Sequence, residues 1–68
     1  MVMAELVWDY IDGPFWVQVI YDPDDGYYRV YKRQGIDIGE PIFEKDEQKA
    51  VTIARKIVGK HIKQRDKR

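Results

Sequence analysis

The chain has 68 residues, with no cysteine, one histidine and a formal net charge of zero. This length fits a single domain over residues 1–68, near the lower limit for independent folding. Without cysteine, and with one histidine, the chain has neither a disulfide framework nor the ligands of a zinc centre, so we expect no metal and no cofactor. No apolar run approaches the ~20 residues that span a membrane, and the N-terminus shows no secretory signal, so we expect a cytoplasmic protein without membrane contact. The absence of Asn, Ser and Cys, with 35% charged residues, is compatible with a thermophilic source.

The N-terminal region predicts one strand after a loose leader. Residues 1–5 are expected to form the leader, and residues 6–11 alternate Leu6, Trp8 and Tyr10 with Val7, Asp9 and Ile11. Such period-2 alternation indicates a β-strand. The sequence Asp-Gly-Pro at residues 12–14 then breaks the strand, because proline cannot donate to a ladder and glycine tolerates a sharp bend.

The central region, residues 15–33, predicts a β-hairpin. Two runs rich in Val, Ile and Tyr alternate with period 2 on either side of the turn sequence Asp-Pro-Asp-Asp-Gly at residues 22–26. Alternating runs joined by such a cluster are typical of antiparallel hairpins. Residues 34–40 contain two glycines and predict a turn or wide loop, in which Ile36 and Ile38 are candidates to turn inward. Residues 41–44 predict a short edge strand, where proline is tolerated.

The C-terminal region predicts a helix. Asp46 is a suitable N-cap, and from Glu47 the apolar residues recur with helical spacing on one side. Gly59 weakens the helix by up to ~1 kcal/mol relative to alanine, so the helix should be firm to about Val58 and extend to about Gln64. Residues 65–68 are expected to form a basic tail.

The predicted fold class is α+β, with a three- to four-stranded antiparallel sheet and one C-terminal helix packed on one face (β-β-β-(β)-α). We expect the helix to cover the face that carries Phe15, Val17, Val19 and Val30, together with Leu6 and Trp8. The opposite face should carry Val7, Ile11 and a set of aromatic, polar and basic side chains. That set is Trp16, Gln18, Ile20, Tyr27, Arg29, Tyr31 and Arg33.

The sequence offers little for catalysis, so we expect no enzyme. Besides the tyrosines, Thr52 is the only hydroxyl, and it falls in the middle of the predicted helix among lysines. His61 falls on the apolar side of the helix, where we expect it to pack against the sheet edge or to be exposed in a fraying turn. The acidic residues at 22, 24 and 25 lack the spacing of an EF-hand, and aspartate is a common turn-forming residue.

Two kinds of partner fit the aromatic face. An apolar surface of this kind marks a contact with a second copy of the chain or with another protein. Aromatic rings interleaved with arginines also suit single-stranded nucleic acid, with Trp16, Tyr27 and Tyr31 stacking on bases and Arg29 and Arg33 on phosphates. Because the net charge is zero and residues 1–28 hold six acids and no Lys or Arg, we place protein contact first.

The helix supplies a second basic surface. Its lysines are Lys49, Lys56, Lys60 and Lys63, and the first, second and fourth recur every seven residues. This pattern favours either an ordinary solvated helix face or salt-sensitive contacts with a phosphate backbone.

The segment VIYDPDDGYYRV at residues 19–30, with Gly35, Gly39, Ala50 and Ala54 after it, resembles the HicB-like antitoxin domain over residues 15–58. The resemblance implies a hairpin with an Asp/Gly turn, a glycine-containing return and a helix packed on the sheet. It also implies neutralisation of a protein toxin, but it assigns no functional residues. We therefore expect a small binding module that self-associates as a homodimer, with nucleic-acid binding as the alternative and an antitoxin-like role as the third hypothesis.

Overall fold

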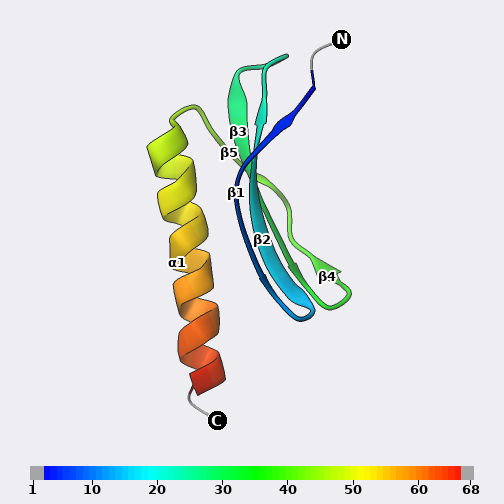
Figure 1. The fold of residues 1–68 in the computed structure, drawn as a ribbon, viewed down its shortest axis with the longest axis vertical. Coiled ribbons are helices and arrows are strands. Elements are labelled where there is room, and N and C mark those ends of the chain that lie inside the picture. Colours follow the sequence, from blue (N-terminus) through cyan, green and yellow to red (C-terminus); the bar gives the residue numbers. More distant parts are fainter. Residues whose placement is uncertain (1–2, 67–68) are drawn as a thin grey trace.

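The computed structural model describes residues 3–66. The chain forms strands β1 (Glu5–Asp12), β2 (Phe15–Asp22), β3 (Tyr27–Gln34), β4 (Asp37–Ile38) and β5 (Ile42–Glu44), followed by helix α1 (Glu47–Asp66). The sheet is antiparallel and α1 lies along one side of it, so the α+β fold class predicted from the sequence is confirmed (Figure 1). The molecule measures 45 × 23 × 16 Å along its principal axes.

The three long strands form a meander in which β2 is central. β1 pairs with β2 and β2 with β3, and the second pairing runs without interruption from Phe15 opposite Gln34 to Asp22 opposite Tyr27. Both turns contain a glycine with positive φ, Gly13 at 58° and Gly26 at 73°, a backbone conformation that other residues rarely adopt. In the β2–β3 turn, the carboxylates of Asp22 and Asp25 accept hydrogen bonds from the amides two residues later. These acids therefore form the turn, as the sequence predicted.

Two short strands share the free edge of β3. β4 pairs with Arg33 and Gln34, whereas β5 pairs with Tyr28, Arg29 and Val30. The predicted loop at residues 34–40 is thus a tight turn that leads into β4. Ile36 and Ile38 do not turn inward, because their exposed fractions are 94% and 68%.

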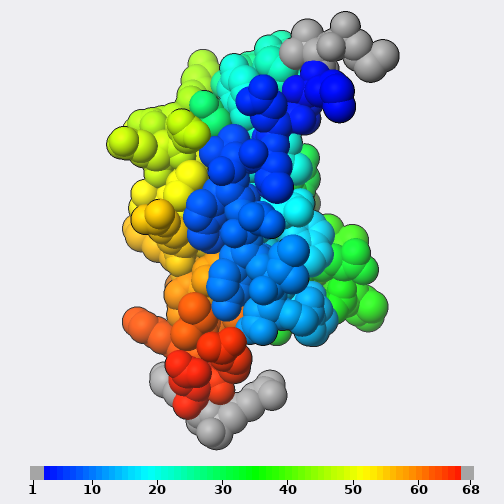
Figure 2. All heavy atoms as spheres, viewed as in Figure 1, coloured from blue at the N-terminus to red at the C-terminus, as the bar shows by residue number. Residues whose placement is uncertain are grey.

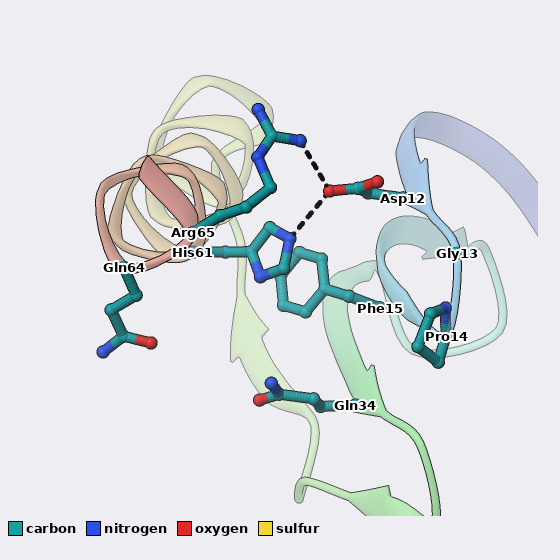
Figure 3. A pocket seen from close by; sticks show the side chains of 8 residues that line it. All are labelled: Asp12, Gly13, Pro14, Phe15, Gln34, His61, Gln64 and Arg65. Carbon is teal, nitrogen blue, oxygen red and sulfur yellow. Dashed lines mark hydrogen bonds and ion pairs between the residues drawn. The ribbon is translucent and has the colours of Figure 1, made fainter. Parts of the chain in front are cut away.

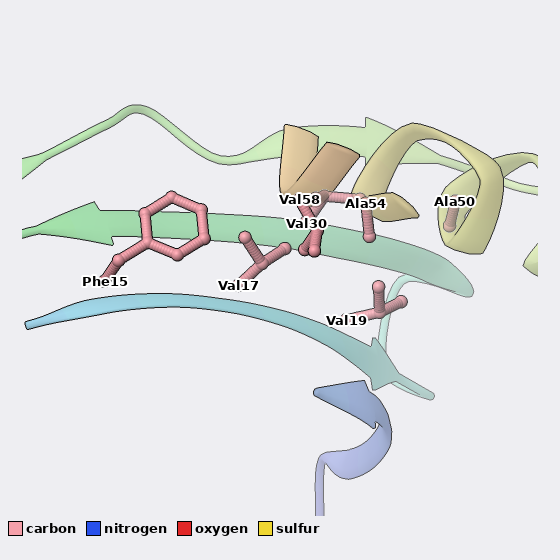
Figure 4. Close-up of a cluster of buried hydrophobic side chains, with 7 residues drawn as sticks. All are labelled: Phe15, Val17, Val19, Val30, Ala50, Ala54 and Val58. Atoms are coloured by element: carbon pink, nitrogen blue, oxygen red, sulfur yellow. The ribbon is translucent and has the colours of Figure 1, made fainter. Parts of the chain in front are cut away.

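Helix α1 packs its small residues against the buried side of the sheet. Asp46 caps the helix, since its Oδ1 accepts a hydrogen bond of 2.9 Å from the amide of Gln48. Ala50 and Ala54 are fully buried, and their short side chains allow the helix to approach the valines of β2 and β3 closely. The resulting core consists of Phe15, Val17, Val19, Val30, Ala50, Ala54 and Val58 (Figure 4).

A β-bulge in β1 changes which side chains face the helix. The register between β1 and β2 shifts between Leu6 and Trp8, and a bulged residue breaks the strict alternation of a strand. Val7 and Trp8 therefore both pack against the core. Leu6 lies opposite Ile20 and is 56% exposed, so the predicted places of Leu6 and Val7 were wrong.

The ends of the described chain also differ from the prediction. β1 begins at Glu5, inside the predicted leader, and α1 continues to Asp66, inside the predicted basic tail. Residues 1–2 of the leader and 67–68 of the tail lie outside the described residues. Within residues 3–66, no helix is both long enough and apolar enough to cross a membrane.

Candidate functional site: the open face of the sheet

The side of the sheet that α1 does not cover, which we call the open face, is organised as three rows of side chains that cross the strands. Because partners in an antiparallel register point to the same side, the pairings assign each row. At one end lie Leu6, Ile20, Arg29 and Phe43; in the middle lie Asp9, Gln18 and Tyr31; at the other end lie Ile11, Trp16, Arg33 and Ile38. The seven face residues predicted from the sequence, Trp16, Gln18, Ile20, Tyr27, Arg29, Tyr31 and Arg33, all lie on this side.

The outer parts of the open face are the most exposed. Phe43 on β5 is 52% exposed, Ile11 on β1 is 64% exposed and Ile38 on β4 is 68% exposed. The rings of Trp16 and Tyr31, nearer the middle, are partly buried by their neighbours. Figure 2 shows β1 and the start of β2 (blue) alongside α1 (yellow to red), with the region around β4 (green) on the side of the sheet away from the helix.

Arg29 is held at one end of the open face by two carboxylates. Its two terminal nitrogens each lie 2.7 Å from a carboxylate oxygen, one of Asp22 and one of Asp25. The guanidinium also lies over the ring of Phe43, 5.2 Å from its centroid, and the rings of Tyr27 and Phe43 are nearly perpendicular with their centroids 6.1 Å apart. The hydrogen bond from Arg29 to Asp22 raises the arginine pKa further above its ordinary value. The positive charge predicted for a phosphate is therefore already neutralised within the chain.

Arg33, the second predicted phosphate contact, also has an acceptor within the chain. Its Nε donates a hydrogen bond of 2.8 Å to the carbonyl oxygen of Gly35 in the β3–β4 turn. This bond directs the guanidinium toward the turn. The two arginines of the open face are consequently fixed in place, with aromatic and aliphatic side chains between them.

Three residues of the open face were not predicted from the sequence to lie there. Leu6 reaches it through the β-bulge, Ile38 through the tight turn before β4, and Phe43 because β5 places it opposite Arg29. The short strand at residues 41–44 was predicted, but the loop before it does not fix its register. In a strand, Ile42, Phe43 and Glu44 must point to alternate faces of the sheet. One known pairing with β3 would therefore have shown which face each side chain occupies.

A separate pocket of about 300 Å³ lies where the end of α1 meets the β1–β2 turn (Figure 3). His61 stacks on Phe15 with ring centroids 3.8 Å apart, and its Nε2 donates a hydrogen bond of 2.9 Å to Asp12 Oδ2. Arg65 donates to the same oxygen at 2.8 Å. Of the two places predicted for His61, packed against the sheet or exposed in a fraying turn, the structure shows the packed one. The pocket contains no hydroxyl or thiol among its lining residues, so the Asp12–His61 pair has no nucleophile beside it.

The pKa values of two carboxylates, Asp12 just before β2 and Asp22 at its end, are both lowered. The hydrogen bond from His61, followed by the interaction with Arg65, lowers the pKa of Asp12 below its ordinary value of 3.8. The hydrogen bond from the amide of Asp24, followed by that from Arg29, lowers the pKa of Asp22. Both groups are therefore charged at neutral pH and contribute to the folded state.

The predicted basic surface lies on α1. Lys49, Lys56, Lys60 and Lys63 are all exposed, on the side of the helix turned away from the buried residues Ala50, Ala54 and Val58. Among residues 3–66, no group of three or more His, Cys, Asp or Glu side chains is placed to hold a metal ion.

Comparison of the chain with protein-family models, with curated proteins and with solved structures found no match. The fold, the open face and the helix surface are therefore what any assignment of function to this chain has to explain.

Proposed function

We propose that this protein is a small non-enzymatic binding module that self-associates through the open face of its sheet. The observation that carries the proposal is the set of apolar and aromatic side chains that the three rows, together with Tyr27, bring to the side without a helix. A cluster of exposed apolar and aromatic side chains marks an interaction site in soluble proteins. Its members are Leu6, Ile11, Trp16, Ile20, Tyr27, Tyr31, Ile38 and Phe43.

The shape of the chain supports a second copy as the occupant. Its accessible surface is 5271 Å², whereas a compact monomer of 8.1 kDa is expected to expose about 4,500 Å². The radius of gyration is 12.6 Å, against about 11 Å for a compact domain of this length. The extra surface is about 800 Å², which is what one partner contributes to a standard protein interface.

The charges of the open face also favour self-association over a polyanion. Asp9, Asp22 and Asp25 balance Arg29 and Arg33 on and beside this surface. A nearly neutral surface can meet a copy of itself without strong repulsion. A phosphate that approached Arg29 would instead be repelled by the two carboxylates that already pair with this arginine.

The arrangement that follows is a face-to-face dimer with the helices on the outside. Stacked sheets pack about 10 Å apart, and Tyr31 and Gln18 would lie near the middle of the contact. Buried aromatic residues near the centre of an interface commonly dominate its binding energy. A toxin, as implied by the resemblance to HicB-like antitoxin domains, would be a different occupant of the same face.

Sedimentation analysis at tens of micromolar, with two matched variants, tests the proposal. Ile38→Lys places a charge on the open face, whereas Ile36→Lys makes the same change in the adjacent turn, outside the three rows. We expect the wild type and Ile36→Lys to form dimers and Ile38→Lys to shift toward monomer. A wild-type protein that remains monomeric, or equal dimerisation by both variants, would refute self-association through this face.

A further inference from the structure

The outer side of α1 carries a narrow row of lysines that the dimer interface does not use. At 100° per residue, Lys49, Lys56, Lys60 and Lys63 fall within an arc of about 60°. The rise of 1.5 Å per residue places Lys49 and Lys63 about 21 Å apart along the helix axis. All four side chains are exposed. We call these four residues the lysine row.

Within the helix, few acidic side chains are available to balance the lysine row, although Lys49 lies near Glu44 and Asp46 at the start of α1. From Gln48 to Arg65 the helix contains no acidic residue. Among the described residues 3–66, the ion pairs of the helix involve His61 and Arg65, and none involves a member of the lysine row. The basic side chains that face the sheet are thus paired with Asp12, whereas those on the outer side present their charge to solvent.

We infer that the lysine row binds the phosphate backbone of double-stranded DNA without reading the base sequence. Four cations in one line complement a polyanion that carries one charge per ~1.7 Å of its axis. The α-helix, ~10–12 Å across with its side chains, also matches the ~12 Å width of the DNA major groove. Lysine ammonium groups on phosphates position a helix on the duplex but carry no base specificity.

The surroundings of the lysine row favour a duplex over a single strand. Single-stranded nucleic acid is bound by grooves in which aromatic side chains stack on the bases. Residues 47–66 contain no Phe, Tyr or Trp, and the one histidine of the helix stacks inward on Phe15. The row therefore supplies charge without a stacking surface, which suits an intact duplex.

The packing of α1 also argues against a membrane as the anionic partner. A helix that binds a lipid surface inserts an apolar face between the headgroups. Ala50, Ala54 and Val58 are buried against the sheet, and the partly buried Ile53, Ile57 and Ile62 also pack against the core. Only the charged side remains outward, so the helix has no apolar face to insert.

This inference stands independently of the proposed dimer. Helix α1 lies on the side of the sheet away from the open face (Figure 1), and the exposed lysine row is on the side of α1 turned away from its buried residues, so occupation of one surface leaves the other accessible. A monomeric protein that binds DNA would refute the dimer and leave this inference standing, and a dimer without affinity for DNA would do the reverse.

Fluorescence anisotropy with a labelled duplex of mixed sequence, over a series of salt concentrations, tests the inference. Four phosphate contacts predict a slope of about −3.6 for the logarithm of affinity against that of salt, and hence a fall of about 150-fold between about 50 and about 200 mM. The test variant Lys56→Gln/Lys63→Gln removes half of the row. The control Lys32→Gln/Lys45→Gln makes the same change in net charge at exposed positions outside α1.

We expect the test variant to halve the slope and the control variant to keep it near the wild-type value. Circular dichroism should show the same helix content in all three proteins, because every substituted side chain is exposed. No binding at low salt would overturn the inference, as would equal losses in the two variants. Tighter binding to vesicles containing phosphatidylserine than to the duplex would also overturn it, since the row would then serve a lipid surface.

Discussion

The two faces of the sheet are built by the same strands but from different side chains. On the covered face, Val17, Val19 and Val30 are buried beneath alanines of α1. On the open face, the alternate positions of the same strands hold Trp16, Gln18 and Tyr31, which are partly exposed. Small β-branched residues fill a tightly packed core, whereas rings with a polar atom tolerate both water and a partner. The contrast teaches that one alternating sequence can specify a core and the proposed docking surface together.

The largest expected effect is a loss of folding stability that should occur at one residue of β2 and not at its neighbour. Val19→Lys should unfold the protein, because it buries an unpaired charge in the core at a cost of more than ~3 kcal/mol. Gln18→Lys should preserve the fold, with a change within about 0.5 kcal/mol, because the new ammonium is at the surface opposite Asp9. Far-UV circular dichroism and urea denaturation measure both. A folded Val19→Lys protein would show that the two faces are reversed.

A smaller loss of stability is expected from truncation in the core. Val30→Ala should lower the free energy of unfolding by about 1–2 kcal/mol, because it removes buried methyl groups and leaves a cavity. Val30 lies opposite Val19 and is 1% exposed. Urea denaturation at a protein concentration low enough to avoid self-association provides the measurement. An unchanged midpoint would contradict the core position of Val30.

Truncation of the next residue should affect association instead of folding. Tyr31→Ala should weaken dimerisation by about 30-fold, the equivalent of ~2 kcal/mol for an aromatic residue central to an interface. At low protein concentration its unfolding curve should stay close to that of the wild type. Sedimentation equilibrium gives the dissociation constant. If Tyr31→Ala unfolds the monomer and Val30→Ala does not, the comparison of the two faces fails.

Much of the comparison between faces was predictable because local chemistry fixes it. The turn at residues 22–26 sets the register of β2 against β3, and the period-2 pattern then assigns Val19 to the core and Tyr31 to the other face. The helix was predictable in the same way, from its cap at Asp46 and the spacing of Ala50 and Ala54. Each of these signals is local, since the hairpin lies within residues 15–33 and the cap with its alanines lies within residues 46–54.

Features that depend on strand register, on contacts between distant residues or on side-chain geometry could not be predicted from the sequence. The bulge at Val7 breaks an alternation that looks regular in the sequence, and it exchanges the places of Leu6 and Val7. The hydrogen bond between Asp12 and His61 joins residues 49 positions apart. The pairing of Arg29 with Asp22 and Asp25 depends on side-chain geometry across the turn. That pairing neutralises Arg29, one of the two arginines that the nucleic-acid interpretation of the open face invoked.

A substitution in α1 is expected to raise the stability of the fold modestly without affecting the open face. Gly59→Ala should raise the free energy of unfolding by up to ~1 kcal/mol, because alanine has the higher helix propensity. An added Cβ at Gly59 would meet no atom within 4 Å, whereas Gly26 has a φ of +73° that strains any other residue. Gly26→Ala is therefore the control and should destabilise the protein. The dimer dissociation constant of Gly59→Ala should not change, because α1 lies away from the open face.

The smallest effect concerns the attachment of the end of α1 to the β1–β2 turn. The folded-state pKa of Asp12 lies below its ordinary value of 3.8, so the folded protein binds fewer protons there than the unfolded chain does. The stabilisation is thus present above the unfolded-state pKa and is lost as the pH falls through the folded-state pKa. Asp12→Asn should be less stable than the wild type at neutral pH, and the difference should shrink on acidification below about pH 4.

Urea denaturation of both proteins at neutral and acidic pH measures this convergence. Asp9→Asn is the control, because within residues 3–66 no ion pair involves Asp9. The control should differ from the wild type by a similar amount at both pH values. A wild-type advantage over Asp12→Asn that persists undiminished in acid would mean that packing of His61 on Phe15 holds the helix end without help from the carboxylate. Apolar contacts alone would then hold α1 against the covered face along the whole length of the helix.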